Sequence, residues 1–341
     1  MPATDAFGRP LATLRISVTD RCNLRCHYCM PQEEYVWLDR QDLLTFEEIA
    51  ALADVFAGAG VHRVRLTGGE PLLRRNLPTL VATLARRPWL TDLALTTNGV
   101  LLADAAQPLR DAGLHRLTVS LDTLQADRFQ RLTRMDALPQ VVAGFEAARH
   151  AGFRGIKIDA VITRGDNDDE LVPLLDFARR NDAEIRFIEY MDVGGATAWR
   201  PDRVVSRAEM LAVIAAAQGP VTAIEEPGST APAERFRLGS GQTFGIIAST
   251  TQPFCRTCDR LRLTADGVML LCLYAQHGTD LRRPLRAGTP PEALDRLVRA
   301  VWESRADRGA EERHAVRDRG VYIPIRALKK DAHLEMHTRG G

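Results

Sequence analysis

Between about residues 12 and 220, short apolar, β-branched runs alternate with longer helical patterns. This alternation is typical of parallel βα units, because two parallel strands need a long crossover that is usually a helix. Thr45 and Glu48 have the spacing of a capping box and predict the start of the first helix. We predict six units, with strands at residues 14–18, 61–67, 93–97, 116–121, 155–163 and 184–191.

Polar or Gly-rich clusters follow nearly every predicted strand. In a doubly wound sheet the ligand-binding groups concentrate at one switch point, whereas in a barrel all strand ends meet at one mouth. We therefore predict an α/β fold in which residues 1–220 form a partial (βα)6 TIM-type barrel. The clusters are Thr67-Gly68-Gly69-Glu70, Thr96-Thr97-Asn98, Ser120 with Asp122, and Met191-Asp192.

The pattern changes after residue 220. Residues 225–233 are rich in Gly, Pro, Ser and Thr and predict a loop or linker. Strand-like runs follow at 244–248, 261–264 and 268–273, and then an Arg-rich helical pattern extends to about residue 307. We predict that residues 221–341 form a C-terminal α+β extension.

The charge balance excludes some classes of protein. Lys and Arg total 45 against 44 Asp and Glu, so a net charge of +1 gives no general attraction to nucleic acid or to a membrane surface. No apolar run approaches the ~18 residues that span a bilayer, and residues 1–10 lack the apolar run of a signal peptide. We expect a cytoplasmic protein with no membrane or nucleic-acid partner.

Three cysteines, Cys22, Cys26 and Cys29, directly follow the first predicted strand. In a reducing compartment such a cluster favours metal ligation over disulfides. Three thiolates within eight residues suit three irons of a 4Fe-4S cluster and leave the fourth iron without a protein ligand. A zinc site that uses His27 is the alternative, but the spacing favours the cluster.

The other three cysteines form a second group, in which two residues separate Cys255 from Cys258 and thirteen residues separate Cys258 from Cys272. One metal position again lacks a thiolate. From the spacing alone, a Cys3His zinc site completed by His277 and an iron-sulfur cluster are equally good interpretations.

Residues 20–31, DRCNLRCHYCMP, resemble the cluster loop of the radical S-adenosylmethionine (SAM) superfamily, and residues 67–71, TGGEP, resemble its glycine motif. The resemblance implies that the open iron binds the amino and carboxylate groups of SAM. Physical reasoning agrees, because Gly68 and Gly69 have no Cβ and allow a ligand to approach the backbone closely.

Residues 254–264, FCRTCDRLRLT, closely resemble the C-terminal motif of the GTP 3′,8-cyclase family, whose members begin molybdenum cofactor biosynthesis. The resemblance covers nearly the whole chain and implies a second 4Fe-4S cluster on Cys255, Cys258 and Cys272, whose open iron binds the guanine base. It also implies a lyase reaction. A 5′-deoxyadenosyl radical takes hydrogen from C3′ of GTP, and the carbon radical attacks C8 to give (8S)-3′,8-cyclo-7,8-dihydroguanosine 5′-triphosphate.

The same resemblance implies roles for individual residues. Positions that match SAM contacts are Tyr28, Gly69, Ser120 and Met191. Positions that match GTP contacts are Arg15, Arg65, Thr96, Lys157, Arg260, Leu261 and Arg262. In the family the C-terminal glycine pair enters the active site, so the implied catalytic set is Cys22, Cys26, Cys29, Arg260, Arg262, Gly340 and Gly341.

Two of these cations can also be singled out without the resemblance. Arg15 and Lys157 each lie inside an apolar strand, so in a covered barrel they point into the lumen and need an anionic partner. Lys157 is also the only lysine among the first 328 residues, which indicates a site that prefers a compact ammonium group. Two positions depart from the family pattern: Arg339 stands where an aliphatic residue is expected, and Asp159 where Asn is expected.

Partners come from the resemblance alone. It implies a homodimer, a flavodoxin or ferredoxin as electron donor, and cyclic pyranopterin monophosphate synthase as the downstream enzyme. Two other functions stay open at this point: a different radical SAM enzyme with an auxiliary cluster, such as a peptide maturase, and a non-enzymatic zinc or iron-sulfur module for nucleic acid. The balanced charge argues against the second.

Overall fold

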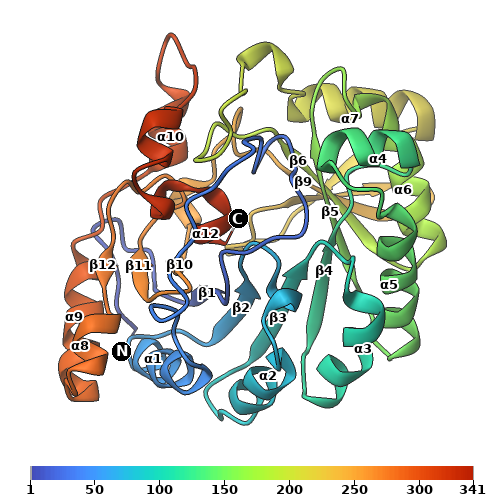
Figure 1. Cartoon of the computed structure of the whole chain (residues 1–341). Helices are drawn as coiled ribbons and strands as arrows, with labels where there is room; N and C mark the ends of the chain where they lie inside the picture. The colour runs from blue at the N-terminus through green and yellow to red at the C-terminus, as the bar shows by residue number, and fades with distance from the viewer. Residues whose placement is uncertain (1, 341) are drawn as a thin grey trace.

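The computed structural model describes residues 2–340. All six predicted strands are present, and they pair in parallel in chain order. Figure 1 shows them as a curved sheet whose outer face is covered by helices. The predicted partial barrel is therefore confirmed. The strands are β1 (Thr13–Ser17), β2 (Arg63–Thr67), β3 (Asp92–Thr97), β4 (Arg116–Ser120), β5 (Lys157–Ile162) and β6 (Glu184–Glu189).

Helices connect these strands and cover the outer face of the sheet. The predicted capping box is present, because the Glu48 N–H donates to Thr45 Oγ1 and the Thr45 N–H donates to Glu48 Oε2. The helices are α1 (Phe46–Gly58), α2 (Leu77–Ala85), α3 (Leu102–Asp111), α4 (Ala126–Thr133), α5 (Leu138–His150), α6 (Leu171–Arg180) and α7 (Arg207–Gln218).

Alternation along β1 explains how one strand serves both the core and the site. Leu14 and Ile16 are fully buried in the main apolar core. Because successive side chains of a strand point to opposite faces, Arg15 lies on the other, concave face.

The chain after residue 220 continues the same sheet. β10 (Arg260–Leu263) pairs in parallel with β1, and β9 (Thr243–Ile247) pairs in parallel with β6. The hairpin of β7 (Val221–Ile224) and β8 (Glu234–Leu238) was not predicted, because β7 is short and its side chains are only partly buried. The predicted loop at 225–233 connects these two strands. The division of the chain at residue 220 stays a prediction.

The remaining elements complete one edge of the sheet and its mouth. β11 (Val268–Leu270) and β12 (Thr279–Asp280) extend the sheet beyond β10. Figure 1 shows α12 inside the curve of the sheet. Among residues 2–340, no helix has both the length and the apolar character needed to span a bilayer. The helices are α8 (Arg282–Arg286), α9 (Pro291–Glu303), α10 (Gly309–His314), α11 (Ile325–Leu328) and α12 (Met336–Arg339).

Candidate functional site

A cavity of about 430 Å³ brings together residues from both ends of the chain. Its lining draws on all six barrel strands and on the segment after β9. Twelve of the predicted site residues line it: Arg15, Tyr28, Arg65, Thr96, Ser120, Lys157, Met191, Cys255, Cys258, Arg260, Arg262 and Cys272.

Three arginines form a row across this cavity because of strand register. Arg15 on β1 pairs with Arg262 on β10 and with Arg65 on β2, so the three lie side by side on one face. Burial and the neighbouring guanidiniums of Arg262 and Arg65 lower the pKa of Arg15 well below its usual value. The row is therefore a buried concentration of positive charge, which favours an anionic ligand.

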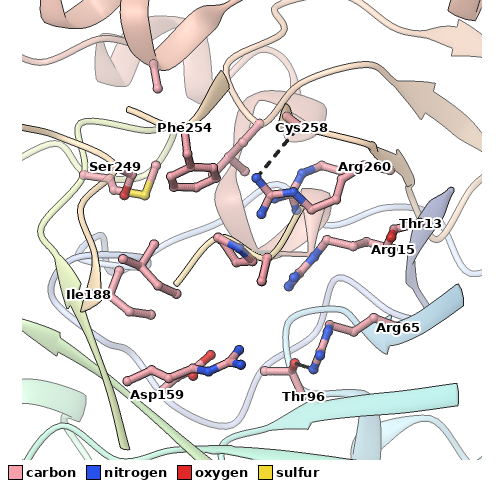
Figure 2. A pocket seen from close by; sticks show the side chains of 18 of the residues that line it. Thr13, Arg15, Arg65, Thr96, Asp159, Ile188, Ser249, Phe254, Cys258 and Arg260 are labelled. Atoms are coloured by element: carbon pink, nitrogen blue, oxygen red, sulfur yellow. Dashed lines mark hydrogen bonds between the residues drawn. The ribbon is translucent and has the colours of Figure 1, made fainter. Parts of the chain in front are cut away.

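Arg65 is held by hydroxyl groups. Its Nη1 donates to Thr96 Oγ1 at 3.0 Å and to Thr118 Oγ1 at 3.1 Å, and Figure 2 shows Arg65 beside Thr96 with Arg15 above them. Burial lowers the pKa of Arg65 to about 10, although the Asp159 carboxylate opposes this shift. Thr96 thus orients a cation on the neighbouring strand.

Lys157 lies on β5 near the same cations. Among residues 2–340, no group forms a hydrogen bond or ion pair with its ammonium. Burial, with the charges of Arg186 and Arg116, lowers its pKa to about 8. An ammonium group in this setting is available to an incoming anion.

The second cysteine group lies at one side of the cavity. Cys255, Cys258 and Cys272 all line it, and burial, with a smaller contribution from the Cys258 thiol, raises the pKa of both other thiols. Burial opposes ionisation of Cys258, but the Arg260 and Arg305 guanidiniums outweigh burial and lower its pKa to about 7. Converging thiols with N–H···S donors are suited to an iron-sulfur cluster. His277, the alternative zinc ligand, is exposed and is not part of the lining.

Arg260 and Arg262 point toward the cavity, and Leu261 between them does not. Arg260 stacks over the Phe254 ring with 4.9 Å between its Cζ and the ring centroid, and its Nη2 donates to Cys258 Sγ, as Figure 2 shows. Leu261 is fully buried in the apolar core, so its predicted contact with GTP stays a prediction.

The first cysteine group lies in the loop after β1, outside the cavity lining. Cys22 Sγ accepts hydrogen bonds from the Leu24 N–H at 3.4 Å and from Asn98 Nδ2 at 3.8 Å. Burial raises the pKa of Cys26, and the Cys22 and Cys29 thiols raise it further. The three thiols are thus close neighbours in a half-buried loop with N–H···S donors, a donor set that fits a 4Fe-4S cluster. Within residues 2–340, no three Cys, His, Asp or Glu side chains gather tightly enough to hold a single metal ion.

The glycine motif packs against this cysteine loop. A Cβ on Gly69 would lie 2.4 Å from the Arg21 carbonyl oxygen, so only glycine allows the two turns to approach. The buried Glu70 carboxylate then joins β2 to β3 by accepting from Thr97 Oγ1 at 2.7 Å and from the Asn98 N–H at 2.7 Å.

The predicted SAM contacts Tyr28, Ser120 and Met191 line the cavity where β4 and β6 end. Tyr28 is oriented by its hydroxyl, which donates to Asp122 Oδ2 at 2.8 Å. Burial raises the pKa of Asp122 to about 6. The cavity therefore reaches from the first cysteine loop to the second cysteine group.

The C-terminal tail is docked at the mouth of the barrel. The Gly340 carbonyl accepts from Arg15 Nε at 3.2 Å and from Arg262 Nη1 at 2.5 Å. Arg339 is 1% exposed and donates to the carbonyls of Leu273 at 2.6 Å and His333 at 2.5 Å. This departure from the family pattern thus has defined docking contacts. Gly341, the last predicted residue, lies outside the described residues.

Sequence reasoning missed several cations of the lining, namely Arg63, Arg116, Arg186 and Arg305. Arg63 lies two residues before Arg65 on the same face of β2, so the period of a strand could have identified it. Arg63, Arg116 and Arg186 each form an ion pair with a nearby carboxylate, of Asp259, Asp92 and Glu184 respectively. Arg305 has no sequence pattern that connects it to the cavity.

Two family models match this chain. The Radical SAM superfamily model matches residues 16–178, and the Molybdenum Cofactor Synthesis C model matches residues 183–311. Among solved structures, SuiB of Streptococcus suis bound to S-adenosylmethionine matches with a TM-score of 0.61 at 16% identity, covering 90% of this chain and 68% of SuiB. This likeness shows the fold alone.

Curated relatives match over almost their full length. "GTP 3′,8-cyclase 1" of Mycobacterium tuberculosis is 54% identical, and the match covers 99% of this chain and 95% of the relative. "GTP 3′,8-cyclase 3" of Mycobacterium bovis is 52% identical over 100% of this chain and 91% of the relative. The GTP 3′,8-cyclase of Acidothermus cellulolyticus is 53% identical over 98% and 91%. With its radical SAM fold, its two cysteine triads and these relatives, the chain belongs to the GTP 3′,8-cyclase family.

Proposed function

We propose that the chain converts GTP to (8S)-3′,8-cyclo-7,8-dihydroguanosine 5′-triphosphate with SAM as cosubstrate, which is the first step of molybdenum cofactor biosynthesis. One observation carries the proposal: a single cavity is lined by predicted SAM contacts, by the second cysteine triad, and by a row of buried cations on neighbouring strands. A nucleoside triphosphate has both the negative charge and the base that such a cavity can accommodate.

The cations would hold the triphosphate. Arg65 presents a guanidinium fixed by Thr96 and Thr118, and Lys157 presents an ammonium without a partner among the described residues. Both are desolvated, so contact with phosphate oxygens gains more free energy than it would at an exposed site. These contacts would hold the ribose of GTP in a fixed orientation within the cavity. A fixed orientation lowers the barrier to hydrogen transfer to the radical.

The thiols of Cys22, Cys26 and Cys29 would hold the 4Fe-4S cluster of the radical SAM family. When bound, this group supplies the electron that cleaves SAM and so generates the 5′-deoxyadenosyl radical. Tyr28, which is fixed by Asp122, would orient the cosubstrate, and Gly69 allows the glycine motif to pack against the cysteine loop. Burial of the site keeps water from a reactive radical.

Cys255, Cys258 and Cys272 would hold a second 4Fe-4S cluster, and the base of GTP would lie next to it. Arg260 is oriented toward this triad by the Phe254 ring and by Cys258 Sγ. A zinc ion at this triad is the competing assignment, and iron and sulfide analysis separates the two. Two clusters correspond to about eight irons per chain, and one cluster to about four.

The test of the proposed function is anaerobic incubation of reconstituted protein with dithionite, SAM and GTP. We expect 5′-deoxyadenosine and the cyclised nucleotide to form together. 5′-Deoxyadenosine release that is equal with and without GTP would overturn the substrate assignment and would favour another radical SAM reaction, such as peptide modification.

Replacing Cys255 with Ala isolates the second triad. We expect this variant to lose cyclisation while it keeps the spectrum of the first cluster. Cys255 and the first triad lie in separate parts of the chain, so loss of both clusters would contradict two independent sites.

We also propose lyase chemistry, a homodimer in the cytoplasm, electrons from flavodoxin or ferredoxin, and delivery of product to cyclic pyranopterin monophosphate synthase. These rest on family resemblance. Light scattering tests the dimer, and cyclisation driven by reduced flavodoxin or ferredoxin in place of dithionite tests the donor.

A further inference from the structure

Arg305 is a buried arginine that follows α9 and reaches the second cysteine triad. It is 2% exposed. Its Nη1 donates to the Cys258 carbonyl at 2.9 Å, and its Nη2 donates to Cys258 Sγ at 3.6 Å. A guanidinium has a rigid fork of donors, so one side chain fixes both the backbone and the sulfur of Cys258.

The guanidinium of Arg305 is itself held on several sides. It stacks over the Trp302 ring with 4.6 Å between Cζ and the ring centroid. Its nitrogens also lie 3.7 Å from Asp5 Oδ2 and 3.4 Å from Asp307 Oδ2. These contacts keep the group charged and in place although it is buried.

The donors at the Cys258 and Cys272 sulfurs are unequal. Cys258 Sγ accepts from two guanidiniums, those of Arg260 and Arg305, both at 3.6 Å. Cys272 Sγ accepts from the backbone N–H of Tyr274 at 3.4 Å. Both guanidiniums line the cavity, but Arg305 is 2% exposed and has further contacts with Trp302, Asp5 and Asp307. Arg305 is therefore the donor that the surrounding protein holds most firmly.

Cationic N–H donors withdraw electron density from a thiolate that binds a cluster. They stabilise the reduced, more negative state and raise the reduction potential. We propose that Arg305 is a positioning residue that fixes Cys258 and sets the reduction potential of the second cluster. This inference rests on the proposed function, because it requires that the second triad holds a 4Fe-4S cluster.

The test uses the full chain with Cys22, Cys26 and Cys29 changed to Ala, so that only the second cluster remains. Two substitutions are made in this background. Arg305→Met removes the charge and the donors, and Arg305→Gln keeps an N–H donor but loses the charge. Arg308→Met is the matched control, because this substitution removes the same charge from the same segment. Arg308 is half-exposed and stacks over the Phe7 ring. We would measure the iron and sulfide content of each protein. An EPR-monitored redox titration gives the midpoint potential of its cluster.

We expect both Arg305 variants to have a more negative midpoint potential than the parent at equal iron content, with the larger shift for Met, and no shift for Arg308→Met. An Arg305→Met protein with a full cluster and the parental potential would overturn the inference. Loss of the cluster from both Arg305 variants would also overturn it, because Arg305 would then only hold the loop. A parent that binds no iron and sulfide would instead overturn the proposed second cluster.

Discussion

Arg15 Nε donates a hydrogen bond to the carbonyl oxygen of Gly340 across 325 positions of the chain, at 3.2 Å. Arg262, the register partner of Arg15 on β10, donates to the same carbonyl. Two cations of the row are therefore oriented by the backbone of the tail. The tail and the cation row form one unit.

Replacing Gly340 with Ala should break this unit. Gly340 has a φ of +68°, and a Cβ would lie 2.4 Å from Thr67 Cγ2. Left-handed backbone costs a non-glycine residue about 1 to 2 kcal/mol, and displacement of the carbonyl also disturbs Arg15 and Arg262. We expect formation of cyclised nucleotide to fall by about tenfold or more, since 1.4 kcal/mol corresponds to a factor of ten.

Gly320→Ala is the control for Gly340→Ala, because a Cβ on Gly320 would meet no atom within 4 Å. It should retain full activity. Equal activity in the Gly340→Ala and Gly320→Ala proteins would show that the docked position of Gly340 is not needed.

Lys157→Met should stabilise the protein in the absence of GTP. The native pKa of about 8 lies below the ordinary lysine value of 10.5, because burial and nearby arginines oppose the charge. Below pH 8 the folded state therefore bears an unfavourable charge, and the free energy of unfolding increases as the pH rises from about 8 toward 10.5. At pH 7 we expect a higher Tm for the variant but a smaller rise of Tm when GTP is added.

Lys329→Met removes an exposed lysine and is the matched control for the Lys157 variant. Its Tm should be that of the parent both with and without GTP. If GTP raises the Tm of Lys157→Met as much as that of the parent, Lys157 does not contact the nucleotide.

The pH dependence of KM for GTP should also report Lys157. As the pH rises through about 8, its ammonium loses a proton, and the attraction to phosphate decreases. KM should therefore rise, while in Lys157→Arg the group stays charged and KM should be flat over the same range. The other charges near Lys157 are those of Arg65, Arg116, Arg186 and Glu184. The same rise of KM in Lys157→Arg would assign the titration to another group.

Arg339→Ile should loosen the tail, although an aliphatic residue is the one expected from the family pattern. The change leaves the carbonyls of Leu273 and His333 without the guanidinium that they accept from. Each unsatisfied buried group costs about 1 to 3 kcal/mol, so the two carbonyls together predict a loss of about 2 to 6 kcal/mol in the free energy of unfolding. Hydrogen exchange should also increase in residues 333–340.

Arg326→Ile is the comparison for Arg339→Ile, because Arg326 is exposed on α11. It should change neither stability nor exchange. Unchanged exchange of the tail in Arg339→Ile would show that the contacts with Arg15 and Arg262 hold the tail without help.

Local patterns were sufficient for much of the fold. The period of two in 14–18 and the capping box at Thr45 depend on neighbouring residues, and both appear where they were expected. The hairpin of β7 and β8 was not predicted from local patterns. Short, partly exposed strands have little apolar periodicity, and this hairpin depends on the edge of β9 for pairing.

In the candidate site, too, some residues could be predicted from local sequence and others could not. Arg15 and Lys157 could be identified because a charge inside an apolar strand is conspicuous in sequence. Arg116 and Arg186 could not be separated from the many surface arginines, since each has a carboxylate partner and only strand register shows that it faces the cavity.

The two cysteine triads, the parallel βα order and the inward position of Arg15 could be predicted from the sequence, because each depends on spacings within a few residues. Folding of the whole chain was needed to place Arg262 and Arg65 on either side of Arg15, to bond Gly340 to this row, and to bring Arg305 to Cys258. These contacts join residues far apart in the chain. They depend on strand register and on the packing of the last segments into the barrel mouth, and no local pattern encodes either.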